Sequence, residues 1–67
     1  MKPLARAIKA LNAAGYTDLI HGGKHDRYRN PQTGRSITIK RHDFDEDDLE
    51  YILKEINQNE NKKPGER

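Results

Sequence analysis

The chain contains no cysteine and no tryptophan, and its aromatic residues are three tyrosines and one phenylalanine. Without cysteine, a disulfide framework, a cysteine-bound zinc site and a thiol nucleophile are all excluded. The longest apolar runs are two or three residues, far too short to span a membrane, and the opening MKPLARAIKALNAAG lacks the apolar centre of a signal peptide. We therefore expect a cytoplasmic protein that makes no membrane contact.

Hydrophobic residues are also scarce, at 31% of the 67 positions, while charged residues make up 36%. A chain near this length buries only about 60% of the surface that its unfolded form exposes, so any core must be thin. We expect one domain over residues 1–57, followed by a polar, aperiodic tail over residues 58–67 that is disordered.

Charge is strongly segregated along the chain. Residues 1–42 carry nine lysines and arginines against two aspartates, a net charge of +7, whereas residues 43–56 have a net charge of −6. A basic block of this kind favours a polyanionic partner, of which nucleic acid is the commonest. The alternative is that the two blocks neutralise each other within one fold.

Apolar residues recur at helical spacing near each end of the chain. Pro3 suits the first position of the first helix, and Gly15 suits the left-handed residue just past its end. In the second helix, Asp45 fits the N-cap and Asp48 the N3 position, and Phe44 before the cap is expected to pack against the helix. The two apolar stripes are Leu4, Ala7, Ile8, Leu11 and Ala14, and then Leu49, Ile52, Leu53 and Ile56.

Three short β-prone runs lie between the helices. We predict strands at Tyr16–Ile20, His25–Arg29 and Ser36–Lys40, joined by a tight turn at His21–Gly23 and a hairpin loop at Asn30–Gly34. The sequence therefore predicts an α+β fold of order α-β-β-β-α, in which two helices cover one face of a three-stranded antiparallel sheet.

The second predicted strand carries the candidate site. Alternation along a strand places His25, Arg27 and Arg29 on one face and Tyr28 on the other, where its ring joins the core. Guanidinium groups bind phosphate oxygens in a planar fork, and an imidazole can move a proton near neutral pH. Together they could cleave RNA without a metal or other cofactor, because the 2′-hydroxyl of the substrate is the nucleophile. Cations at Lys24, Lys40 and Arg41, with His42, extend this predicted phosphate-binding surface.

Two other interpretations of the same residues stay open. A polar strand face rich in lysine and arginine can simply keep a small sheet soluble and discourage edge pairing. The three histidines, with Asp26 or Asp43, could also be taken as a metal site, but their spacing matches no recognised ligand pattern, and we expect none.

The sequence resembles the HicA family of toxins from Leu4 to Ile56. The matching motifs are Gly15-Tyr16, GKHDRYR at residues 23–29, GRSITIKRH at residues 34–42, and LEYILKEI at residues 49–56. The resemblance implies a fold like that of double-stranded-RNA-binding domains (dsRBD-like). It further implies metal-independent cleavage of mRNA and inhibition by a HicB-type antitoxin protein. The catalytic histidine of the family corresponds to His25, with Gly23 and Tyr28 as flanking motif positions.

The sequence differs from the family pattern at three places. Lys24 replaces a small residue, Asp26 replaces a second histidine, and the acidic segment DFDEDD precedes the last helix. These differences motivate two alternatives: a non-catalytic RNA- or protein-binding module, and a phage- or plasmid-borne inhibitor that uses Asp47 and Asp48 to mimic nucleic acid. Cleavage of RNA by the chain, and its loss in His25→Ala, would separate the first hypothesis from the other two.

Overall fold

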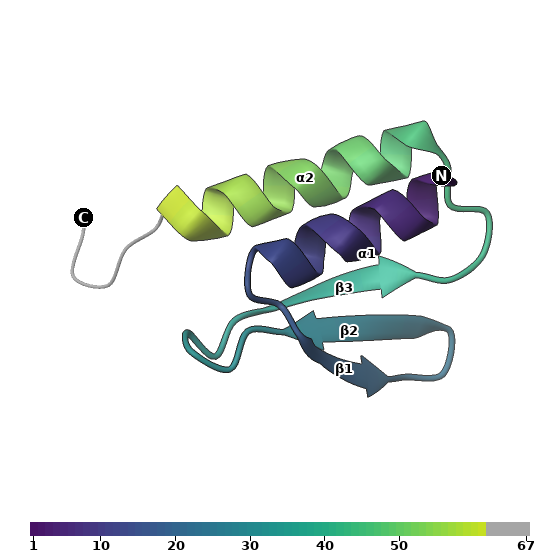
Figure 1. Ribbon diagram of the computed structural model, residues 1–67. Helices are drawn as coiled ribbons and strands as arrows, with labels where there is room; N and C mark the ends of the chain where they lie inside the picture. The colour runs from purple at the N-terminus through teal and green to yellow at the C-terminus, as the bar shows by residue number, and fades with distance from the viewer. Residues whose placement is uncertain (62–67) are drawn as a thin grey trace.

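The computed structural model describes residues 1–61, which form two helices and one sheet (Figure 1). The elements follow in the order α1 (Pro3–Ala13), β1 (Asp18–His21), β2 (His25–Arg29), β3 (Ser36–Lys40) and α2 (Glu46–Asn61). The strands form one antiparallel sheet in the order β1-β2-β3. The predicted α+β class and the α-β-β-β-α order are confirmed.

Both helices lie side by side against the same side of the sheet (Figure 1). Their apolar stripes meet the residues of β2 and β3 that point toward them. The buried core consists of Ala7, Leu11, Tyr16, Tyr28, Ile37, Ile39, Leu49, Ile52 and Ile56. As predicted, Tyr28 is buried, while Leu4, Ile8 and Ala14 pack against the edge of this cluster. The predicted apolar stripe of α2 includes Leu53, and this part of the prediction is wrong, because Leu53 is 44% exposed.

The first strand begins later than the sequence predicted. Tyr16 lies outside the strand as one of the most buried residues, and β1 runs instead from Asp18 to His21. All four residues of β1 are exposed, because the helices cover β2 and β3 but leave this edge strand open. Gly15 turns the chain at φ +99° after α1, the Tyr16 amide donates to the Leu11 carbonyl at 2.9 Å, and the Tyr16 ring belongs to the core.

The second helix has the predicted start but a later end. The Asp48 amide donates to Asp45 Oδ1 at 3.1 Å and the Asp45 amide donates to Asp48 Oδ2 at 3.0 Å, a reciprocal capping box. The helix continues to Asn61, so residues 58–61 of the predicted disordered tail are helical. The remainder of that prediction, residues 62–67, lies outside the described residues.

Candidate functional site

His25, Arg27 and Arg29 project from the sheet face that the helices leave uncovered. Along β2, exposure alternates: His25 and Arg27 are exposed and Arg29 is half-buried, while Asp26 and Tyr28 are buried. We call His25, Arg27 and Arg29 the basic row. The predicted division of β2 into a basic face and a core face is confirmed, because the two-residue period of a strand allows little else once Tyr28 is in the core.

The neighbouring strands supply different partners to each member of the basic row. Arg29 lies opposite Asp18 of β1, and its Nη1 is 3.5 Å from the carboxylate. His25 lies opposite Lys40 of β3. Among residues 1–61, Arg27 has no ion-pair partner, so its guanidinium can bind an anion without first breaking a contact.

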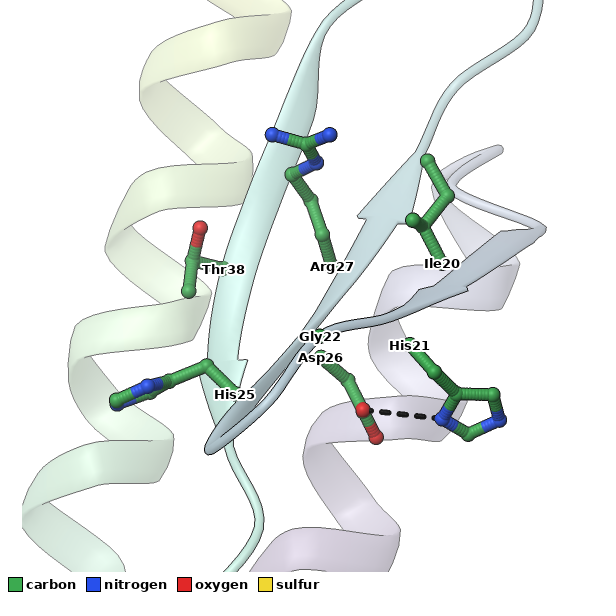
Figure 2. Close-up of a pocket in the computed structure, with 7 residues that line it drawn as sticks. All are labelled: Ile20, His21, Gly22, His25, Asp26, Arg27 and Thr38. Atoms are coloured by element: carbon green, nitrogen blue, oxygen red, sulfur yellow. Dashed lines mark hydrogen bonds and ion pairs between the residues drawn. The ribbon is translucent and has the colours of Figure 1, made fainter.

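A shallow hollow of about 280 Å³ lies against the basic row (Figure 2). Arg27 and His25 line it together with Thr38 from β3 and Ile20 from β1. In Figure 2, the Arg27 side chain extends along the sheet between β1 and β3, and the His25 ring points toward α2. His21, Gly22 and Asp26 complete the lining, so the hollow combines two imidazoles, a guanidinium, a hydroxyl and a carboxylate that is paired with His21.

The turn between β1 and β2 fixes the position of His25, the first residue of β2. The Gly22 amide donates to the His25 carbonyl at 2.9 Å. A Cβ on Gly22 would lie 2.5 Å from that same carbonyl oxygen, so the close approach requires glycine. Gly23 has open space around its Cα, and Lys24 is exposed at the bend.

Arg41 stabilises this turn and does not join the basic row. Its Nη2 donates to the carbonyl oxygens of Gly22 and Gly23, and its Nη1 is 3.6 Å from Asp26 Oδ1. The sequence analysis included Arg41 among the phosphate-binding residues; that role stays a prediction, and in the structure its guanidinium is engaged by two carbonyl oxygens and one carboxylate. His42 follows it in the loop before α2 and is exposed.

Asp26 lies on the helix-facing side of β2 and pairs there with His21. The His21 Nδ1 atom is 3.1 Å from Asp26 Oδ1, and the Asp26 side chain is only 11% exposed (Figure 2). The carboxylate points away from the face that carries His25. Burial of the Tyr28 hydroxyl raises the pKa of Tyr28 above its ordinary value, and the negative charge of Asp26 raises it further. Sequence reasoning missed this pair, although the antiparallel register that opposes positions 21 and 26 follows from the tight turn.

A second groove, of about 180 Å³, lies between the end of β3 and α2. His25, Thr38 and Lys40 line it from the sheet, and Tyr51 and Asp48 line it from the helix. Lys40 Nζ lies 3.2 Å from Asp48 Oδ2 and connects the two elements. The hydrogen bond from the Asp45 amide lowers the pKa of Asp48 below its ordinary value, and Lys40 lowers it as well, to a smaller extent. The sequence analysis did not identify Tyr51. The feature that could have indicated it is an aromatic residue on the second helix that lies outside the apolar stripe.

The described residues offer no obvious place for a metal ion. Within residues 1–61, no three side chains of histidine, aspartate or glutamate are gathered closely enough to coordinate one. Neither helix, over the same residues, has the length and apolar character needed to cross a membrane. The side chains of the basic row can themselves bind anions through guanidinium groups and transfer protons through imidazole.

Comparison with protein-family models, with curated proteins and with solved structures found no match for this chain.

Proposed function

We propose that this protein is a metal-independent RNA endonuclease of the HicA toxin type, which cleaves mRNA in the cytoplasm and is inhibited by a HicB-type antitoxin. One observation carries the proposal: His25 and Arg27 line the same hollow on the uncovered face of the sheet, and Arg27 is without an ion-pair partner among residues 1–61. The resemblance from Leu4 to Ile56 supports the same assignment.

The reaction requires only proton transfers and charge stabilisation from the protein. The 2′-oxygen attacks the adjacent phosphorus as His25 accepts the 2′ proton, and the P–O5′ bond then breaks as the imidazolium returns a proton to the 5′ oxygen. The products are a 2′,3′-cyclic phosphate and a 5′-hydroxyl, with no net change in protons.

Arg27 stabilises the charge that develops on the phosphoryl oxygens. Its guanidinium presents two parallel N–H donors, which match two oxygens of a phosphodiester. Arg29 lies two residues further along the same face, although its guanidinium shares its charge with Asp18. We therefore assign the reacting phosphate to Arg27 and an adjacent backbone phosphate to Arg29.

The proposal is tested by incubating labelled mRNA with the purified protein in EDTA. We expect fragments ending in 2′,3′-cyclic phosphate or 3′-phosphate from the wild type, and a loss of at least about a hundredfold in rate for His25→Ala. Since His25 is exposed, circular dichroism should show the variant folded. Lys9→Ala, which removes an exposed cation from α1, is the matched control and should cleave normally. Normal cleavage by His25→Ala would refute the assignment.

A second candidate function is RNA binding without cleavage. It is favoured by one observation: within residues 1–61, the imidazole of His25 has no hydrogen-bond partner that would orient it. A catalytic histidine is usually held by a carboxylate or carbonyl group. Intact RNA in the EDTA assay, together with a salt-sensitive gel shift, would favour this function over the first.

A further inference from the structure

We infer that the groove between β3 and α2 holds one unstacked nucleobase of a single-stranded RNA, next to the phosphate at the basic row. The inference rests on the proposed function, because the groove matters for RNA only if the basic row holds a phosphate. It adds what that proposal lacks, namely the part of the substrate that is recognised and the strandedness of the RNA.

Tyr51 supplies the stacking surface. It is 61% exposed, although it lies on α2 between the buried residues Leu49 and Ile52. An exposed aromatic ring that faces a groove is the usual platform for an unpaired base, since every base has a π-face and stacking needs no specific hydrogen bonds. Phe44, half-buried at the same groove, extends its apolar wall.

The groove opens directly onto the candidate catalytic residue. His25 and Thr38 line both this groove and the hollow beside Arg27, so the two depressions share a wall. A nucleotide bound across that wall would place its phosphate at Arg27 and its base at Tyr51. With a volume of about 180 Å³, the groove suits a single ring system and is well below the size of sites for larger ligands.

Charge complementarity selects this occupant over an apolar peptide. His25 and Lys40 line the groove on its sheet side, Arg27 lies in the adjoining hollow, and an RNA backbone brings the matching negative charge. Lys40 and Asp48 pair with each other, so their charges offset within the groove, and the positive charge for the phosphate comes from Arg27 in the adjoining hollow. Polar atoms of Thr38 and Lys40 can accept or donate hydrogen bonds at the edge of the base.

The test follows backbone amide shifts by NMR during titration with adenosine 3′-monophosphate or with inorganic phosphate. We expect both probes to shift the amides of Arg27 and its strand neighbours, and only the nucleotide to shift those of Phe44 and Tyr51. Tyr51→Ala should weaken nucleotide binding by about five- to a hundredfold, the loss of one stacked base, and Tyr51→Phe should retain it. Leu53→Ala is the matched control, because Leu53 is exposed on α2 outside this groove and should leave the affinity unchanged.

The alternative outcomes separate this inference from the proposed function. Shifts confined to β2 with both probes, or unchanged affinity in Tyr51→Ala, would overturn the base site and leave the phosphate site standing. Absence of shifts with either probe would overturn both. Equal binding of a single-stranded and a fully paired oligoribonucleotide would also contradict the inference, since a paired base cannot enter the groove.

Discussion

At position 26, the alternation of a β-strand places a carboxylate on the covered face of the sheet. There it accepts a hydrogen bond from His21 and lies near the guanidinium of Arg41, and all three residues surround the turn that precedes His25. The Asp26 carboxylate lies on the face opposite His25, because adjacent residues of a strand point in opposite directions.

The contacts of Asp26 with Arg41 and His21 should contribute to the stability of the fold. Asp26→Ala should lower the free energy of unfolding by about 1–3 kcal/mol, because the half-buried Arg41 loses its carboxylate partner. His21→Ala should cost less than about 1 kcal/mol, since the His21 side chain is 69% exposed. Urea denaturation at pH 7 measures both. Equal stability of Asp26→Ala and the wild type would show that the buried pair contributes nothing.

At the scale of elements, the β1–β2 hairpin is the part of the fold that holds His25 in place. The two glycines of its turn look equivalent in the sequence but differ in the structure. Gly22 approaches the carbonyl oxygen of His25, whereas no atom lies within 4 Å of a Cβ built on Gly23. The first glycine is thus required by packing and the second is not.

Substitution of each glycine by alanine should separate these roles. Gly22→Ala should destabilise the protein by about 1–3 kcal/mol, because the methyl group would overlap the His25 carbonyl and the hairpin must open to relieve it. Gly23→Ala should change stability by less than about 0.5 kcal/mol. Thermal unfolding gives both values, and amide shifts at His25 report whether the strand has moved. A Gly22→Ala variant as stable as Gly23→Ala would contradict the packing argument.

At the scale of the whole molecule, the basic and acidic blocks of the chain neutralise each other only in part. Lys40 pairs with Asp48 at 3.2 Å, and Arg6 pairs with Glu46 at 3.4 Å across the two helices. Arg27 takes part in no such pair within residues 1–61. Arg27 is therefore a positive site on the sheet that these pairs between the two blocks do not neutralise.

Salt dependence tests whether that positive site binds a backbone phosphate. For the wild type, the logarithm of the association constant with a single-stranded oligoribonucleotide should fall linearly with the logarithm of salt concentration. Arg27→Ala should reduce the magnitude of that slope by about 0.7, the effect of one lost phosphate contact. Fluorescence anisotropy at four salt concentrations measures the slopes, with Lys9→Ala as the control. An unchanged slope for Arg27→Ala would place the phosphate elsewhere.

Local sequence patterns predicted the order and type of the elements, but they were less accurate for the ends of strands and helices and for which residues of α2 are buried. Pro3, Gly15 and the Asp45–Asp48 capping box marked helix ends correctly because caps act within one turn of the chain. The predicted strand start at Tyr16 is wrong because its amide bonds back to Leu11 of α1 and its ring is buried in the core, which outweighs the strand propensity of the local run. Leu53 was assigned to the core because it continues an apolar run, but it lies on the exposed side of α2.

The sequence by itself determined the order of the elements and the face on which His25, Arg27 and Arg29 lie, since periodicity and turn chemistry operate over a few residues. Only the tertiary structure decided which charges stay unpaired and which residues become neighbours. Arg41 contacts the β1–β2 turn, Lys40 pairs with Asp48, and Tyr51 lines the groove beside His25. The contacts of Lys40 and Tyr51 depend on how α2 packs against the sheet edge, and packing between distant segments leaves no signature in local spacing.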